Sequence, residues 1–366
     1  MSKSFCSLGL MSGTSADGVD ASIIQSDGDS KYKVILDRYY NYDQNIFKNI
    51  HDLKDEINDF KDLNNLSNKI QLLEKDITIF HADVVNKIIK DFKYNIDFIG
   101  FHGQTIFHNE KEKISKQLGD GKLLAKLTKR TVIYDFRQND LKNGGNGAPL
   151  TPIFHKLLKK IFKISHVTFV NIGGITNITS IIDENMSGTD IGPGMCLIDR
   201  WIRQKTKKNY DKNGMIAKKG KVNYECLKLL IDNFIKKEKN LSKSPVQSFD
   251  TKHFDFSAIK DLSLEDGAST LTEFSSFIII NTIIEKKLNK HEVILCGGGR
   301  KNNFLVEKLK KKISLKLIDE YGLDGDFIES QAFAYLAIRS YLSLPISFPE
   351  TTRVNKPCVG GAIIKY

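Results

Sequence analysis

Three glycine turns follow apolar stretches of this sequence, and backbone amides in such turns can bind phosphate oxygens. The first contains Gly13 and Gly18, the second is Gly173-Gly174, and the third runs over 297–299. Glycine lets backbone N–H groups approach an anion closely and permits positive φ. One such turn alone is usually an ordinary hairpin, but three in one chain predict phosphate binding.

Polar side chains in the first turn add to its chemistry. The hydroxyls of Ser12, Thr14 and Ser15 could donate hydrogen bonds to a phosphate, and Asp17 and Asp20 could orient Mg²⁺ through water. The more familiar nucleotide signatures are missing, because the chain contains no G-x-x-x-x-G-K-[ST] and its third turn does not fit G-x-G-x-x-G. The sequence therefore disfavours a P-loop or dinucleotide-binding fold.

An aspartate precedes a Gly-Pro-Gly segment in the second half of the chain. Asp190 lies two positions before Gly192, and a helical pattern begins near Met195. We expect Asp190 to lie in a loop, where its carboxylate could accept a proton from a nucleophile. The alternative is an ordinary turn or helix-entry residue.

Further polar residues lie at the ends of predicted elements. His102 and Thr105 end one predicted strand, Arg137 follows another, and Glu329 begins the last long helix. An arginine in such a place could bind a carboxylate through two hydrogen bonds or form a surface ion pair. His102 and His108 do not have the spacing of a zinc pair.

The apolar pattern predicts alternating strands and helices. Strands are expected at 5–10, 19–24, 96–101, 131–135, 167–172, 175–182, 292–296 and 359–364, and helices at 46–60, 66–88, 195–202, 224–235, 269–288, 302–313 and 329–342. Each half begins with strand, glycine turn and strand, which indicates two related halves. We expect largely parallel sheets and a domain boundary at 143–149.

Composition sets broader limits. The 366 residues suggest two domains, and no apolar run approaches the ~20 residues that span a bilayer. The net charge is 55 − 44 = +11, and 200–243 alone contributes 14 − 4 = +10. Few aromatic residues accompany these charges, which favours a solvated surface over nucleic-acid binding. With five scattered cysteines and no secretory signal, we predict a cytoplasmic protein without membrane or nucleic-acid partners.

The motifs, in order, resemble those of the anhydro-N-acetylmuramic acid kinase family from residue 8 to about residue 363. They are 9–20 (GLMSGTSADGVD), 102–105 (HGQT), 135–137 (DFR), 147–149 (GAP), 171–177 (NIGGITN), 190–194 (DIGPG), 210–212 (YDK), 296–299 (CGGG) and Glu329 with 332–337 (AFAYLA). This family belongs to the superfamily of actin, hexokinase and the heat-shock chaperone ATPases. The resemblance implies an α/β fold of two ribonuclease-H-like domains, 1–148 joined by 345–366 and 149–344, with an ATP cleft between them.

The resemblance also implies a reaction, in peptidoglycan recycling and amino-sugar catabolism. The substrates would be 1,6-anhydro-N-acetylmuramic acid and ATP, and the products N-acetylmuramic acid 6-phosphate and ADP. Asp190 matches the family's catalytic aspartate, which deprotonates water for attack on the anomeric carbon. The sugar oxygen released from the anhydro bridge then attacks the γ-phosphate.

Other site residues follow from the same resemblance, and a homodimer is left open. Magnesium would be oriented by Asp17 and Asp20, and the sugar would contact His102, Thr105, Arg137, Pro149 and Glu329, with Arg137 suited to the lactyl carboxylate. The positions expected to bind ATP are Gly13, Thr14, Ser15, Ala16, Asp17, Gly18, Val19, Asp20, Asn171, Gly173, Gly174, Gly192, Gly194, Gly297, Gly298 and Gly299.

Three positions depart from the family pattern. Ala16 replaces a leucine, Ile191 replaces the threonine usual after the aspartate, and Met195 replaces an asparagine. These changes could alter rate or substrate tolerance. The alternatives are another sugar kinase or a phosphatase of the superfamily, and an actin-like ATPase. A chaperone would need an additional peptide-binding domain, which does not fit in this length.

Overall fold

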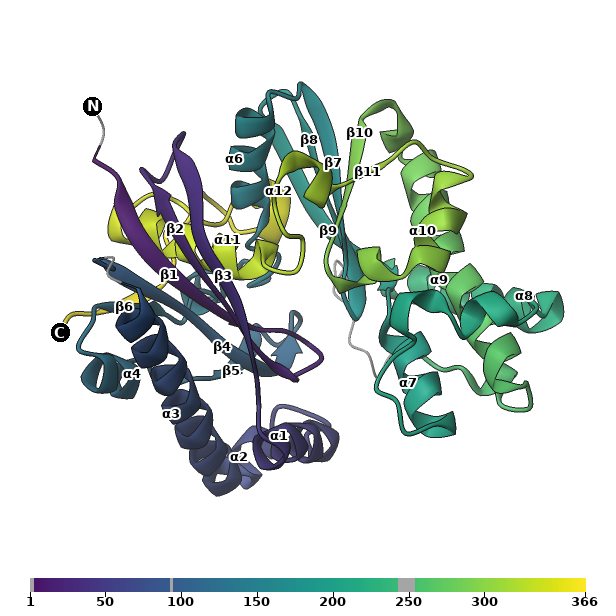
Figure 1. Ribbon diagram of the computed structural model, residues 1–366, viewed down its shortest axis with the longest axis horizontal. Coiled ribbons are helices and arrows are strands. Elements are labelled where there is room, and N and C mark those ends of the chain that lie inside the picture. The colour runs from purple at the N-terminus through teal and green to yellow at the C-terminus, as the bar shows by residue number, and fades with distance from the viewer. Residues whose placement is uncertain (1–2, 93–94, 243–253) are drawn as a thin grey trace. The chain divides into compact units, whose positions relative to one another are not determined.

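The computed structural model describes residues 3–92, 95–242 and 254–366, and the chain divides into two compact units (Figure 1). Unit 1 comprises Met1–Lys163 and Phe327–Tyr366, and unit 2 comprises Ile164–Asp326. Each unit is built on its own β-sheet with helices packed against it. The protein is therefore an α/β protein with two sheets.

The sheet of unit 1 has the strand order β12-β6-β4-β1-β2-β3, with β5 paired to β4. Its strands are β1 (Phe5–Ser12), β2 (Gly18–Ser26), β3 (Tyr32–Asn41), β4 (Phe98–Asn109), β5 (Ile114–Leu118), β6 (Val132–Tyr134) and β12 (Ala362–Ile364). Its helices are α1 (Gln44–Glu56), α2 (Asp62–Asn65), α3 (Ser67–Asp91), α4 (Gly121–Thr128), α5 (Gln138–Lys142), α6 (Pro152–Phe162), α11 (Ile328–Tyr341) and α12 (Pro349–Thr352).

The alternation of side chains along β1 assigns the two faces of this sheet. Leu8 and Leu10 belong to the core cluster that includes residues of α1, α3 and α4. Gly9 points the other way, where a Cβ would lie 1.9 Å from the carbonyl oxygen of Ser330 in α11. Successive residues of a strand face opposite sides, so glycine here allows α11 to pack directly against the sheet.

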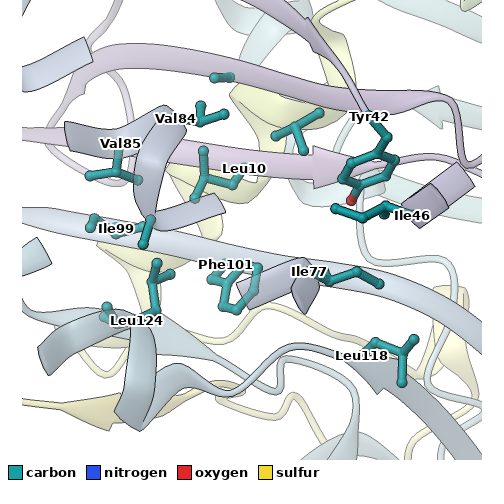
Figure 2. Close-up of a cluster of buried hydrophobic side chains, with 14 of the residues drawn as sticks. Leu10, Tyr42, Ile46, Ile77, Val84, Val85, Ile99, Phe101, Leu118 and Leu124 are labelled. Carbon is teal, nitrogen blue, oxygen red and sulfur yellow. The ribbon is translucent and has the colours of Figure 1, made fainter. Parts of the chain in front are cut away.

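The larger core of unit 1 fills the face opposite α11. Figure 2 shows Leu10 of β1 and Phe101 of β4 in one cluster with Ile77, Val84 and Val85 of α3. These three residues are spaced at i, i+7 and i+8, so they lie on one face of α3, as the apolar period predicts. The helix expected at 66–88 is thus confirmed as α3.

The sheet of unit 2 has the order β11-β10-β7-β8-β9. Its strands are β7 (His166–Ile172), β8 (Ile175–Ile182), β9 (Asn185–Pro193), β10 (Glu292–Cys296) and β11 (Lys316–Leu317). Its helices are α7 (Cys196–Lys205), α8 (Tyr224–Ser242), α9 (Leu264–Glu285) and α10 (Asn303–Lys310), with short 3₁₀ segments η1 (Lys212–Gly214), η2 (Ala217–Lys219), η4 (Ser257–Ile259), η5 (Leu288–Lys290), η6 (Gly298–Lys301) and η7 (Ile318–Tyr321).

The two sheets share one topology. In unit 1, β1 pairs antiparallel with β2 and parallel with β4, β2 pairs antiparallel with β3, and β4 pairs parallel with β6. In unit 2, β7, β8, β9, β10 and β11 repeat these directions in the same order. This is the ribonuclease-H-like arrangement, and it confirms the predicted internal repeat. The expectation of largely parallel sheets was wrong, because each sheet begins with an antiparallel meander.

The boundary between the units differs from the one expected at 143–149. Residues 149–163 and 327–344 lie in unit 1, because α6 and α11 pack on its elements. The ring of Phe154 in α6 lies 5.7 Å from that of Tyr335 in α11 and 5.4 Å from that of Tyr32 in β3. Glycine-rich composition indicated a linker, but the segment is a loop inside unit 1.

Among the residues that the structure describes, one helix meets the length and composition of a membrane span. Helix α9 has a mean hydropathy of 1.2 over its apolar window, and 67% of that window is buried inside the structure. Its residues Leu271 and Ile279 belong to core clusters of unit 2. The apolar character of α9 is therefore that of a core helix.

Candidate active site

The loop between β1 and β2 is held from β4. Ser12 donates from Oγ to Gln104 Oε1 at 2.6 Å, and Gln104 Nε2 donates to the carbonyl oxygen of Gly13 at 3.1 Å. Both Ser12 and Gln104 are buried. A buried amide with both ends engaged has one orientation, so Gln104 fixes where the loop leaves the sheet.

Helix α1 holds the next two residues of this loop. Lys54 donates from Nζ to the carbonyl oxygen of Thr14 at 3.2 Å, and His51 Nε2 donates to that of Ser15 at 3.1 Å. Donors thus engage the carbonyl oxygens at three successive positions, 13–15. These oxygens would otherwise repel a phosphate, so the arrangement suits the anion binding that the turn predicts.

Two carboxylates lie in and after this loop. Asp17 is exposed and accepts a hydrogen bond from Ser15 Oγ at 2.7 Å, and Asp20 pairs with Tyr39 across β2 and β3. Burial and these two carboxylates raise the pKa of Tyr39. Among the described residues no group of three or more metal-binding side chains occurs. Since Mg²⁺ keeps several waters and takes one or two carboxylates plus phosphate oxygens, Asp17 and Asp20 fit a water-mediated site.

Buried His102 and half-buried Arg137, two of the predicted sugar residues, form a hydrogen-bonded pair. Arg137 Nη2 lies 2.9 Å from His102 Nε2, and His102 Nδ1 lies 2.8 Å from the carbonyl oxygen of Gly103. The guanidinium can only donate and the carbonyl can only accept, so His102 carries its proton on Nδ1. Burial and the neighbouring Arg137 lower the pKa of His102 to about 3, which keeps the ring neutral.

The other predicted sugar residues also belong to unit 1. Thr105 accepts a hydrogen bond from Gln117 Nε2 at 3.2 Å, and half-buried Glu329 lies in the first turn of α11. That helix reaches β4, since the ring of Phe333 lies 4.4 Å from that of His102. Pro149 ends the loop whose Gly147 carbonyl oxygen accepts from Arg137 Nη1 at 2.8 Å. His102 and Thr105 lie within β4, which continues to Asn109, and not at its end as expected.

Asp190 lies on a strand, which corrects the loop that we expected. It is half-buried on β9 and pairs with Asn177 of β8, which in turn pairs with Asn171 of β7. The register shifts between Thr176 and Asn177, so one residue of β9 is extra at this point. The glycine and proline content indicated a loop, but β9 is an edge strand and tolerates Pro193 at its end.

The second glycine turn caps helix α7. The N–H groups of Gly194 and Met195 donate to the carbonyl oxygens of Gly174 and Gly173, both at 2.9 Å. A Cβ on Gly194 would lie 2.4 Å from the Gly173 carbonyl oxygen. A glycine is therefore needed at position 194 for this close approach. Its backbone N–H already donates a hydrogen bond to Gly174. Gly192 has φ +145°, which also favours glycine.

The third glycine turn leads into η6 and is not a hairpin. Gly297 has φ +80°, and a Cβ there would lie 2.3 Å from Asn171 Oδ1. A Cβ on Gly299 would lie 2.2 Å from Ile172 Cγ2, whereas a Cβ on Gly298 would meet nothing within 4 Å. Gly297 and Gly299 are thus required by the fold, and Gly298 is not. A Cβ on Gly13 would likewise meet nothing within 4 Å.

Sequence reasoning missed an arginine that anchors this third turn. The guanidinium of Arg300 is buried and bonds Asp319 through two nitrogens, Asp324 at 2.8 Å and Asp326. It also donates to the carbonyl oxygen of Gly297 at 3.2 Å. Arg300 directly follows the CGGG motif, but its burial depends on carboxylates 19 to 26 positions away in the sequence, so no local signal marked it.

Comparisons with known proteins agree with this arrangement of motifs. The family model described as "Anhydro-N-acetylmuramic acid kinase" matches residues 6–366. A protein of that name from Pelagibacter ubique is 52% identical over 378 aligned residues, covering 100% of both chains. The chain belongs to the anhydro-N-acetylmuramic acid kinase family. A second relative of that name, from Zymomonas mobilis, is 36% identical and covers 97% of this chain and 98% of its own.

One solved structure shows a distant likeness to the chain. The (R)-2-hydroxyglutaryl-CoA dehydratase component A of Acidaminococcus fermentans covers 92% of this chain and 99% of its own, with 10% identity and a TM-score of 0.46. This likeness is too distant to support a conclusion. The predicted family and its kinase activity are confirmed by the sequence relatives. The individual site residues, the cytoplasmic location, the absence of nucleic-acid and membrane partners and a homodimer stay predictions.

Proposed function

We propose that this chain opens 1,6-anhydro-N-acetylmuramic acid with water and phosphorylates it with ATP, giving N-acetylmuramic acid 6-phosphate and ADP in cell-wall recycling. The observation that carries this proposal is the family match over residues 6–366 together with relatives that bear the kinase's name. The geometry of each unit supports it separately. Unit 1 holds the five predicted sugar residues and the first phosphate turn, and unit 2 holds Asp190 and the other two turns.

The reaction balances as one hydrolysis coupled to one phosphoryl transfer. Water adds its oxygen to C1 of the sugar and gives a proton to Asp190, while the bond from C1 to O6 breaks. O6 takes the bonding electrons and forms a new bond to the γ-phosphorus of ATP, and the bond from that phosphorus to the β-phosphate oxygen breaks. Asp190 then releases its proton to solvent, so one proton is released for each ADP formed.

In this proposal Asp190 is the general base. Its place on β9, in one cross-strand row with Asn171 and Asn177 and beside the register shift, holds it on a paired strand, and rigid elements hold catalytic groups more accurately than loops do. The two asparagines are neutral, so their row adds no charge that would compete with the carboxylate. Proton abstraction by a well-placed base contributes about 10²–10⁴-fold to the rate.

Arg137 is the proposed partner of the lactyl carboxylate. Neutral His102 and the Gly147 carbonyl oxygen each accept one hydrogen bond from its guanidinium, and neither accepting group carries a charge. These two hydrogen bonds hold the guanidinium in place, and arginine binds carboxylates through paired N–H donors, so Arg137 suits the anionic lactyl group.

ATP is proposed to contact the loop at 13–20 and the glycines of unit 2, with Mg²⁺ near Asp17 and Asp20. Magnesium, when bound, would neutralise charge on the phosphates. The residues of this chain orient the nucleotide through backbone N–H groups, and Gln104, His51 and Lys54 hold the loop in shape.

Gly298→Ala and Gly297→Ala separate ligand contact from fold. Because a Cβ at Gly298 meets nothing within 4 Å, Gly298→Ala should leave the free energy of unfolding unchanged and raise the KM for ATP. Gly297→Ala should lower the free energy of unfolding by about 1–3 kcal/mol, because its φ and its contact with Asn171 exclude a side chain. Urea titration and steady-state kinetics measure both. A KM for ATP unchanged by Gly298→Ala would remove this glycine from the nucleotide site.

The decisive experiment measures turnover of 1,6-anhydro-N-acetylmuramic acid with ATP in ¹⁸O-labelled water. We expect ADP and the 6-phosphate in equal amounts, with one labelled oxygen at C1 and none in the phosphate. No turnover would overturn the proposed substrate and leave another sugar kinase of the superfamily. A product without label at C1 would overturn the hydrolytic step.

A further inference from the structure

A buried carboxylate lies directly behind the loop that supports Arg137. Asp140 of α5 is 1% exposed and accepts hydrogen bonds from the N–H of Gly147 at 2.7 Å and from Thr352 Oγ1 at 2.6 Å. Thr352 is fully buried in α12, and its carbonyl oxygen accepts from the N–H of Asn146 at 2.7 Å. Two segments far apart in the sequence therefore fix one short loop.

The backbone of Gly147 contacts both Asp140 and Arg137. Its N–H donates to Asp140 Oδ2 at 2.7 Å, and its carbonyl oxygen accepts from Arg137 Nη1 at 2.8 Å. Gly147 has φ +74°, a conformation that glycine adopts readily and most other residues avoid, so glycine suits this position. The hydrogen bonds run from Thr352 through Asp140 and Gly147 to Arg137.

The loop is also packed too closely to shift without cost. A Cβ on Gly145 would lie 2.1 Å from Asp140 Oδ2, so the backbone passes directly over this carboxylate. Lys113 also holds this loop, because its Nζ donates to the carbonyl oxygen of Gly145 at 3.0 Å and to Asn146 Oδ1 at 2.8 Å. The carbonyl oxygen that orients Arg137 is thus held at a fixed point.

We infer that Asp140 is a positioning residue for recognition of the lactyl carboxylate of the sugar. It does not touch the substrate. It fixes the Gly147 carbonyl oxygen, which with His102 sets the direction of the Arg137 guanidinium. This inference rests on the proposed function, because it takes the lactyl carboxylate as the partner of Arg137.

Asp140→Ala tests the inference through substrate selectivity. We expect the KM for 1,6-anhydro-N-acetylmuramic acid to rise about 10-fold, with kcat reduced by less than about 3-fold and the KM for ATP unchanged. The inhibition constant of 1,6-anhydro-N-acetylglucosamine, which lacks the lactyl group, should change little. Asp140→Asn should restore the KM, since the amide oxygen can accept from Gly147 and its NH₂ can donate to Thr352.

Matched variants separate positioning from general damage. Asp27 is another buried aspartate of unit 1, and it accepts from the N–H groups of Ser30 and Lys31 at 2.8 and 2.9 Å in the β2–β3 turn. Asp27→Ala should lose stability without changing the KM for the sugar. Should Asp140→Ala not fold, Thr352→Val removes one hydrogen bond to Asp140 and should raise the same KM, whereas Thr352→Ser should not.

The outcomes are distinguishable. An unchanged KM for the sugar in both Asp140→Ala and Thr352→Val, or an equal loss of affinity for the sugar with and without the lactyl group, would overturn the positioning role while the wild-type activity stands. No turnover of the anhydro sugar by the wild type would overturn the proposed function, and this inference with it.

Discussion

Asp190→Asn is expected to lower kcat by about 10²–10⁴-fold, the contribution of a general base. Asparagine has nearly the same shape and can occupy the same place on β9, opposite Asn177, but it cannot accept a proton from water. The KM values for ATP and sugar should change little, because binding precedes the proton transfer. Steady-state kinetics and the ¹⁸O content of the residual product measure this effect.

A matched control lies on the same hairpin. Asp183 is in the turn between β8 and β9, with its side chain 78% exposed and 3.1 Å from His166 Nε2. Asp183→Asn should leave kcat unchanged. Full activity of Asp190→Asn would show that another group removes the proton. Equal losses in both variants would point to a general effect on the hairpin.

Acidification from pH 7 to pH 5 is expected to destabilise the folded protein strongly. Burial lowers the pKa of His81 to about 4 and that of His155 to about 3, and burial with Arg137 lowers that of His102 to about 3. All three belong to unit 1. In the unfolded chain these imidazoles titrate near their ordinary pKa of 6.5.

The direction follows from proton binding. Between pH 6.5 and about 4 the unfolded state binds protons at these histidines and the folded state does not, so the free energy of unfolding falls as the pH falls. Each histidine lowers the free energy of unfolding by about 1.4 kcal/mol per pH unit below 6.5, which amounts to about 2 kcal/mol at pH 5. The part of this window above about pH 5 lies above the range in which most carboxylates titrate.

Urea unfolding at pH 7, 6 and 5 measures this acid sensitivity. His155→Leu should remove about one third of the pH dependence, because one of three similar groups no longer titrates. His166→Gln, at an exposed position of unit 2 with its side chain 43% exposed, should retain the full dependence. A free energy of unfolding that is the same at pH 7 and pH 5 would contradict the neutral, buried state of these rings.

Local pattern identified several elements with one apolar face, although it missed the helices α4 and α6, which also bury an apolar face. The period of apolar residues predicted α3, and the strand–turn–strand pattern predicted the β1–β2 and β7–β8 hairpins, because these signals depend on neighbours in sequence. Among the strands, the local pattern missed β3, β5, β9 and β11. Strand β9 contains glycine and proline, which are rare in strands. Strand β3 has no fully buried residue and no clear alternation of apolar and polar side chains, so it lacks the pattern of a half-buried strand.

The motifs also identified which residues to consider, without showing how they are held. HGQT at 102–105 contained Gln104, but its two hydrogen bonds to the first turn depend on parallel pairing of β1 and β4. The neutral tautomer of His102 depends on Arg137, 35 positions away. Asp140 gave no signal, since its partner Thr352 lies 212 positions along the chain.

The glycine turns show the same division most clearly. By itself the sequence determined that three such turns exist, that they stand in the family's order, and that the halves of the chain repeat, because composition and spacing carry that information. Only the tertiary structure decided what each glycine does. Gly297 and Gly194 are required by neighbouring protein atoms, whereas Gly13 and Gly298 have open space where a side chain would be. That distinction depends on atoms brought close by folding, so spacing along the chain could not supply it.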